Sequence, residues 1–143
     1  MSDILLSVQN HIATITLNRP PVNALSLSMM TAFVEALKAV DTDDSVRVVI
    51  ITGSGRCFSA GVDLKEQLAA LESGEPGPAS VGARMYDALL HGRKPTIAAI
   101  NGPALGAGLG IAASCCILVA SENTRVGIPE VAVGMLGGAR HAQ

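Results

Sequence analysis

Two glycine-containing loops carry the residue types in this 143-residue chain that suit the binding of a negatively charged oxygen. They are residues 59–63 (SAGVD) and 104–108 (ALGAG), and each follows an apolar stretch and leads into a predicted helix. The first turn of a helix has N–H groups without intrahelical acceptors, and glycine lets another group approach the backbone closely. Each loop could therefore direct a backbone N–H toward a bound anion.

Together the two loops could form an oxyanion hole, provided that the strands before them lie side by side. One such donor contributes roughly 2.7–4 kcal/mol to the stabilisation of an enolate or a tetrahedral oxyanion. Glycine-rich turns are also common connections between elements, so ordinary loops with capping glycines are the alternative interpretation. Residue types alone favour the ordinary turns without excluding the two-donor site.

Glu130 is the carboxylate in the last third of the chain that is best suited to acid–base chemistry. It follows Pro129 and has apolar neighbours at 128, 131 and 133. A carboxyl group in such surroundings can carry a proton between two atoms of a substrate near neutral pH. The alternative is a glutamate in the first turn of a helix, stabilised there by the helix dipole. Both interpretations remain open from the residues alone.

The elements that must position these residues alternate between strand and helix, which indicates an α/β fold. Two closely spaced strands come first, so we expect ββα units in addition to simple βαβ winding. The β-branched run at 46–52 is typical of a strand buried on both faces of a sheet, residues 41–44 (DTDD) predict a solvated turn, and residues 73–80 (SGEPGPAS) predict a loop. The expected elements are strands at 4–8, 11–17, 46–52, 96–100 and 116–120, and helices from Ser26 or Ser28 to about Val40, from Asp63 onward, and from about Val81 to Gly92.

Composition predicts one domain with an apolar core. Hydrophobic residues make up 49% of the chain and charged residues 15%, and the length fits a single domain. The net charge of −2, with no basic cluster, argues against nucleic-acid binding. Three cysteines without C-x-x-C spacing and three scattered histidines support neither a disulfide framework nor a metal site. We expect buried cysteines, no metal and a cytoplasmic protein, because the N-terminus also lacks the pattern of a signal peptide.

Two other classes of protein are suggested by the glycine-rich segment. Residues 95–121 contain no charge and are long enough to cross a bilayer, but Asn101, Pro103 and several glycines interrupt them, so we expect no membrane span. A dinucleotide-binding fingerprint would need Gly or Ala at position 111, where this chain has Ile111. A dinucleotide-binding fragment stays as an alternative that titration with NADH would exclude.

Three segments in order resemble the enoyl-CoA hydratase/isomerase family, the crotonases. They are GRCFSAGVDLKE (55–66), KPTIAAINGPALGAGLG (94–110) and GIPEVAVGMLGG (127–138), and NRPPVNALS (18–26) agrees with them. The resemblance implies a crotonase-like spiral of ββα units, with residues 1–143 as its N-terminal part and the C-terminal helical region absent. It also implies a homotrimer or hexamer where the full fold is present.

The resemblance implies site residues as well. The N–H groups of Val62 and Ala107 would hold the carbonyl oxygen of an acyl-CoA thioester, and Glu130 would be the acid–base carboxylate. The family's second carboxylate falls at Gly110, which has no side chain to offer. The residues expected to bind acyl-CoA are Ala60, Val62, Asp63, Leu64, Lys65 and Ala107.

The expected function is therefore that of a lyase or isomerase of fatty acid metabolism, with an acyl-CoA thioester as substrate. No separate cofactor is expected, because coenzyme A is part of the substrate. With a single carboxylate, proton transfer between C2 and C4 of an enoyl-CoA is favoured over simple hydration. The alternative is a catalytically weak crotonase-like protein that binds acyl-CoA or has a structural role.

Overall fold

A five-stranded mixed sheet supports the loops described above. The computed structural model describes residues 2–133, and its sheet has the order β1-β2-β3-β4-β6. β1 and β2 are antiparallel, whereas β3, β4 and β6 run parallel to β2 and to one another. The strands are β1 (Ile4–Gln9), β2 (Ile12–Leu17), β3 (Val48–Gly53), β4 (Thr96–Ile100) and β6 (Ile117–Ala120).

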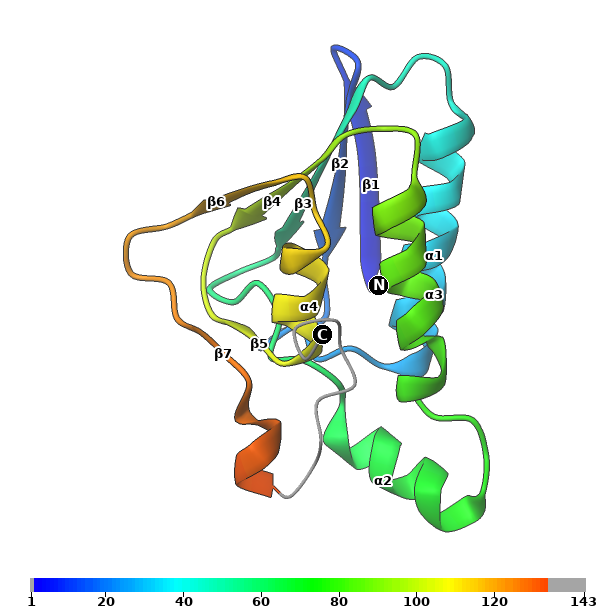
Figure 1. The fold of residues 1–143 in the computed structure, drawn as a ribbon, viewed down its shortest axis with the longest axis vertical. Helices are drawn as coiled ribbons and strands as arrows, with labels where there is room; N and C mark the ends of the chain where they lie inside the picture. The colour runs from blue at the N-terminus through cyan, green and yellow to red at the C-terminus, as the bar shows by residue number, and fades with distance from the viewer. Residues whose placement is uncertain (1, 134–143) are drawn as a thin grey trace.

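Two long helices lie side by side against one face of this sheet (Figure 1). They are α1 (Leu27–Thr42) and α3 (Ala79–His91), and α4 (Ala107–Ala113) packs beside α3. A second, two-stranded sheet pairs β5 (Ala104–Leu105) with β7 (Val126–Gly127), and α2 (Leu64–Ser73) and η1 (Pro129–Val133) lie at the lower end of the view. The predicted α/β class is confirmed.

Local sequence explains how the first elements begin and end. The β1–β2 hairpin turns at Asn10 and His11, which have φ of 51° and 67°, and two positive φ values match the twist of paired strands. The turn therefore lies one residue later than residues 9–10, which separate the two strands expected at 4–8 and 11–17. Ser26 caps α1, since its Oγ accepts the Met29 N–H at 3.1 Å, which resolves the choice between Ser26 and Ser28.

The core lies between the sheet and the helices. Alternate residues of β2, β3 and β4 are buried, for example Ile15, Ile51 and Ala98. The other face of β3 is only partly covered in the described structure, and Ile50 there is of intermediate burial. The expectation that residues 46–52 are buried on both faces is thus wrong, because α1, α3 and α4 all pack on the same face of the sheet.

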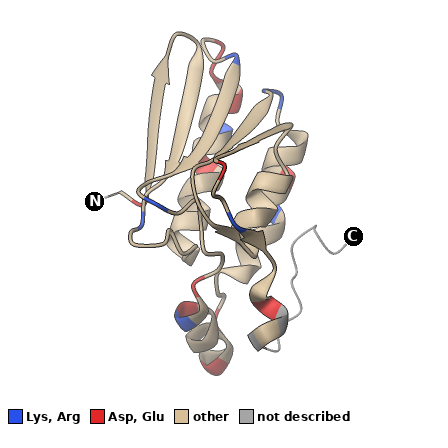
Figure 2. Ribbon diagram, turned by 90° about the vertical axis from the view of Figure 1, so that its left-hand side faces the viewer, with Lys and Arg blue, Asp and Glu red and all other residues tan. Residues whose placement is uncertain are grey.

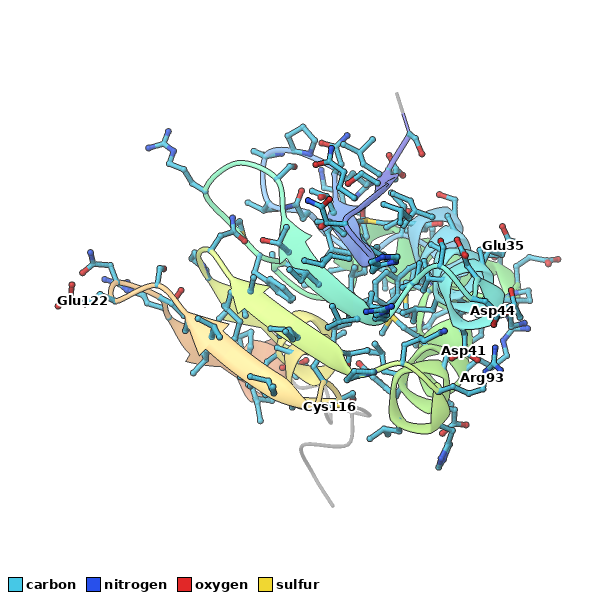
Figure 3. All side chains as sticks on the ribbon, turned by 90° about the horizontal axis from the view of Figure 1, so that it is seen from above. Glu35, Asp41, Asp44, Arg93, Cys116 and Glu122 are labelled. Carbon is cyan, nitrogen blue, oxygen red and sulfur yellow. The ribbon has the colours of Figure 1, made fainter. Side chains whose placement is uncertain are left out.

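The acidic segment 41–44 is also different from the solvated turn that was predicted. α1 continues through Thr42, and Asp41 contacts Arg93 between α3 and β4 (Figure 3). The Arg93 backbone N–H donates to Asp41 Oδ1 at 2.6 Å, and Arg93 Nε lies 3.4 Å from Asp41 Oδ2. This contact ties the end of α1 to the start of β4.

Two further sequence expectations need correction. The loop expected at 73–80 is shorter, because α2 continues through Ser73 and α3 begins at Ala79. Cys57 and Cys115 are buried as expected, but Cys116 is exposed at the start of β6 (Figure 3).

Charged residues lie outside the sheet. Figure 2 shows the strands of the large sheet free of Lys, Arg, Asp and Glu, which fall instead on helices and connections. No helix in the described part of the chain is long and apolar enough to cross a bilayer.

Candidate active site

The two glycine-containing loops meet at one edge of the sheet. β3 and β4 are parallel neighbours, with Thr52 opposite Ala99, so the chain leaves both strands at the same edge. Ser59 and Ala104 form an isolated parallel bridge, in which the Leu105 N–H donates to the Ser59 carbonyl at 2.9 Å. The strands before the two loops therefore lie side by side, which is the condition for a site shared by both loops.

Glycine allows the two loops to pack backbone against backbone. A Cβ built on Gly61 would lie 2.9 Å from the Leu105 carbonyl oxygen and 3.4 Å from the Ala107 nitrogen. A Cβ on Gly108 would lie 2.6 Å from the Ser59 carbonyl oxygen. Side chains at either position would push the loops apart, so the approach of Val62 to Ala107 depends on these glycines.

The Val62 and Ala107 N–H groups have no hydrogen-bond acceptor among residues 2–133. Val62 bridges Leu25, but the bonds of that bridge use the Gly61 carbonyl (2.8 Å) and the Asp63 N–H (3.0 Å). Ala107 is the first residue of α4, where a helical N–H lacks an intrahelical acceptor. Two neighbouring backbone donors are thus available, as an oxyanion hole requires.

Asn23 holds the first of these loops in place, a role that no sequence motif indicates. Its side chain is fully buried, and Nδ2 donates to the carbonyls of Cys57 (2.7 Å) and Ser54 (3.0 Å). Its Oδ1 accepts the Arg19 backbone N–H at 3.0 Å, and the Ser59 hydroxyl donates to the Asn23 carbonyl at 2.8 Å. An asparagine among apolar residues just after Pro20–Pro21 is the only sequence signal for this role.

Asp63 caps α2 as the sequence predicted. Its Oδ1 accepts the N–H groups of Lys65 (3.1 Å) and Glu66 (3.2 Å), and its Oδ2 lies 2.8 Å from Arg19 Nη2. Although burial acts to raise it, the pKa of Asp63 lies below its ordinary value, because the Glu66 N–H, the Arg19 guanidinium and the Lys65 N–H stabilise the carboxylate. This side chain is therefore committed to holding the loop.

The other residues expected to bind acyl-CoA lie around the same loop. Ala60 is partly buried and donates its N–H to the Val22 carbonyl at 2.9 Å. Leu64 and Lys65 are exposed at the start of α2, where they are accessible to a ligand. Their role in binding stays a prediction.

Glu130 reaches the site through the small sheet. The Gly106 N–H donates to the Gly127 carbonyl at 2.9 Å, and this pairing of β5 with β7 places η1 beside Gly106. A Cβ built on Gly106 would collide with Glu130 Oε1 and lie 3.0 Å from Cδ. Glu130 Oε2 is buried without a hydrogen-bond partner in the described structure. The carboxylate thus borders the peptide unit that carries the Ala107 donor.

Tyr86 reaches the N-terminal end of α4 from α3, although no sequence motif includes it. It is 5% exposed, and its hydroxyl donates to the Ala107 carbonyl at 3.5 Å. Burial, together with the negative charge of Glu130, raises the pKa of Tyr86 to about 12. Tyr86 lies next to Met85 on the buried face of α3. An aromatic residue at such a position is compatible with a purely structural role in the core.

Gly110 occupies the remaining position of interest. It is buried in α4, and its N–H donates to the Gly106 carbonyl at 3.0 Å, one helical turn away. It contributes no functional group to the site. The end of the third motif, residues 134–138, lies outside the described residues.

Comparison with known proteins identifies the class to which this fold and site belong. A sequence model of the enoyl-CoA hydratase/isomerase family matches residues 7–143. The chain is 40% identical to the 2,3-dehydroadipyl-CoA hydratase of Escherichia coli, over all of this chain and 56% of that protein. The chain therefore belongs to the enoyl-CoA hydratase/isomerase family, as the sequence motifs suggested.

Solved structures confirm the crotonase fold. The enoyl-CoA hydratase of Bacillus anthracis superposes with a TM-score of 0.90 at 30% identity, covering 99% of this chain and 56% of that one. An enoyl-CoA hydratase structure from Geobacillus kaustophilus gives 0.87 at 38% identity, with 99% and 55% covered. The chain spans about half the length of the relatives it matches.

Proposed function

We propose that this chain carries the acyl-CoA site of an enzyme that moves a double bond by way of a thioester enolate. The observation that supports this most directly is the position of Glu130. Its carboxylate packs against Gly106, next to the Ala107 N–H, which has no acceptor among residues 2–133. An acid–base group therefore lies beside the peptide unit that carries an oxyanion donor.

In this proposal the thioester oxygen accepts hydrogen bonds from the Val62 and Ala107 N–H groups. Negative charge grows on that oxygen when a proton leaves C2, and fixed donors stabilise the growing charge. Glu130 takes the proton from C2 of a 3-enoyl-CoA, the electron pair moves the double bond to C2–C3, and Glu130 returns the proton to C4. The proton is conserved, so one carboxylate is sufficient.

Isomerisation is proposed over hydration because of Gly110. Hydration requires a group that orients and activates water as well as a group that protonates carbon. Gly110 has no side chain for this, and the carboxylate of Asp63 is engaged with Arg19 and the N-terminus of α2.

The proposal includes the substrate path and the assembly. Coenzyme A would lie along residues 60–65, where Leu64 and Lys65 are exposed, and the Lys65 ammonium suits a phosphate. A homotrimer or hexamer, a cytoplasmic location and a place in fatty acid metabolism complete the proposal, with no cofactor beyond the substrate.

The test is to identify the products formed from 3-enoyl-CoA and 2-enoyl-CoA by the parent protein and by Glu130→Gln. We expect a 2-enoyl product from 3-enoyl-CoA and a fall in kcat of about 10²–10⁴-fold in the variant, because general acid–base groups contribute that much. Glu122→Gln is the matched control, since Glu122 is exposed beyond β6 (Figure 3), and it should keep full activity.

Three results would contradict the proposal in different ways. A hydroxyacyl product would favour hydration despite Gly110. Tight binding of acyl-CoA without turnover would favour a binding or structural role. Full activity in Glu130→Gln would remove Glu130 from the mechanism.

A further inference from the structure

Two polar groups approach the N-terminal end of α4 from different elements. The Tyr86 hydroxyl comes from α3 and lies 3.5 Å from the Ala107 carbonyl oxygen. The Glu130 carboxylate comes from η1 and packs against Gly106, with Cδ 3.0 Å from the place of a Cβ there. The hydroxyl and the carboxylate therefore both border the first residues of α4, and the charge of Glu130 acts on Tyr86.

Neither group is fully satisfied by its present contacts. An O–H···O hydrogen bond is ordinarily about 2.5–3.0 Å long, so the Tyr86–Ala107 contact of 3.5 Å is weak. Glu130 Oε2 is buried and has no partner within residues 2–133. Leaving a buried acceptor unpaired is unfavourable, and more so when it is charged. A hydrogen bond from the Tyr86 hydroxyl to the Glu130 carboxylate would satisfy both groups.

We propose that Tyr86 is a positioning residue, whose hydroxyl donates to the Glu130 carboxylate and orients it toward the substrate. This inference rests on the proposed function, because it assigns Glu130 the proton-transfer step. The Ala107 carbonyl is the second acceptor of the same hydroxyl. The hydroxyl can return to Ala107 while Glu130 carries the proton and has lost its charge.

Tyr86 does not itself transfer the proton in this scheme. Burial first, and the Glu130 charge second, hold the pKa of Tyr86 at about 12, so the hydroxyl keeps its proton at neutral pH. Tyr86 contributes an uncharged hydroxyl that donates a hydrogen bond to the carboxylate.

Tyr86→Phe tests the role, because it removes the hydroxyl and keeps the buried ring. We expect kcat for isomerisation to fall about 10–100-fold with KM nearly unchanged, as for the loss of one hydrogen bond to a charged group. The midpoint of thermal unfolding should change little. In a Glu130→Gln background the same substitution should have almost no further effect, since the carboxylate that Tyr86 positions is gone. An equal loss in both backgrounds would refute the positioning role.

A second measurement does not depend on turnover. Tyr86 is the only tyrosine and the chain has no tryptophan, so the absorbance of tyrosinate reports on this residue alone. Glu130→Gln should lower the pH at which Tyr86 ionises from about 12, because a nearby negative charge is removed. Glu122→Gln should leave it unchanged, and circular dichroism at each pH verifies that the proteins remain folded.

The two measurements separate the possible failures. Identical titrations of the parent and Glu130→Gln would refute the contact between Tyr86 and Glu130. If Glu130→Gln shifts the Tyr86 titration but Tyr86→Phe leaves kcat unchanged, the positioning role is refuted and the contact is not. If Glu130→Gln shifts the Tyr86 titration but the parent protein turns over no enoyl-CoA, the proposed function is contradicted and the contact is still supported.

Discussion

Gly106 has to remain without a side chain for the carboxylate to reach the site. The space that a Cβ would fill is taken by the Glu130 carboxylate, and the backbone has φ of 51°. Both facts disfavour any other residue, the first through collision and the second through backbone strain. The carboxylate that a side chain would displace is the group proposed to move the proton.

Gly106→Ala should therefore lower activity far more than its strain alone would explain. We expect a fall in kcat of at least the ~10²-fold attributed to loss of general acid–base catalysis, with destabilisation of about 1–3 kcal/mol. Gly55→Ala is the matched control, since Gly55 also has positive φ (68°) but no atom within 4 Å of its Cβ position. It should be destabilised slightly and stay active. Comparable losses in kcat for both variants would show that strain, not collision with Glu130, is responsible.

At the scale of single residues, the sequence predicted the groups that belong to motifs and missed those defined by contacts. The motifs indicated Val62, Ala107 and Glu130, which the structure brings together. Asn23 and Tyr86 have no such pattern, because a buried asparagine and an aromatic residue on an apolar helix face are both compatible with purely structural roles. Their importance is visible only from the atoms that they touch.

At the scale of elements, the start of α2 contributes stability that depends on pH. The folded pKa of Asp63 lies below its ordinary value of 3.8. The stabilisation from its charge is therefore fully present above about pH 3.8 and is lost as the pH falls through the lower, folded value.

Asp63→Asn should expose this dependence, because asparagine still caps a helix but cannot pair with Arg19 as a charge. We expect the parent to be more stable at pH 7 by about 0.2–1 kcal/mol, the range of exposed ion pairs, and the difference to shrink below pH 3.8. Denaturant unfolding at several pH values measures it. Asp44→Asn, an exposed change at the end of α1 (Figure 3), should show no such trend. A difference that is constant with pH would exclude a contribution from the Asp63 charge.

Periodicity and caps were sufficient to predict most of the longer elements. Alternation indicated β1 and β2, and candidate caps at Ser26 or Ser28 and at Asp63 indicated the starts of α1 and α2. The two-residue strands β5 and β7 could not be predicted, because they exist only through their pairing with each other. The burial of β3 on one face only could not be predicted from the local sequence either, since it depends on which face of the sheet the helices cover.

At the scale of the whole molecule, β6 is the least protected part of the sheet. It pairs with β4 on one side, and no strand among residues 2–133 pairs with its other side. Its apolar residues are exposed, with Ile117 at 53%, Leu118 at 50% and Val119 at 58%. An exposed apolar edge strand favours pairing with another chain.

Val119→Lys should reduce self-association of this chain in solution, because charge on an edge strand opposes edge-to-edge pairing. Sedimentation or light scattering over a range of concentrations measures this. Leu71→Lys is the control, as it makes the same change on α2, away from the sheet, at a side chain that is 69% exposed. Equal effects of the two substitutions would show that general solubility, not the β6 edge, is responsible.

The buried Asn23 network has a consequence for the order in which the molecule folds. The Asn23 side chain donates to the carbonyls of Ser54 and Cys57, which are 31 and 34 residues away in the sequence. The Cys57 thiol in turn donates to the Pro103 carbonyl, 46 residues from Cys57. Contacts between distant residues form slowly, because the intervening chain must first be closed into loops. We therefore expect the site to be completed after the hairpin and the long helices. Recovery of activity during refolding should lag behind recovery of helix content.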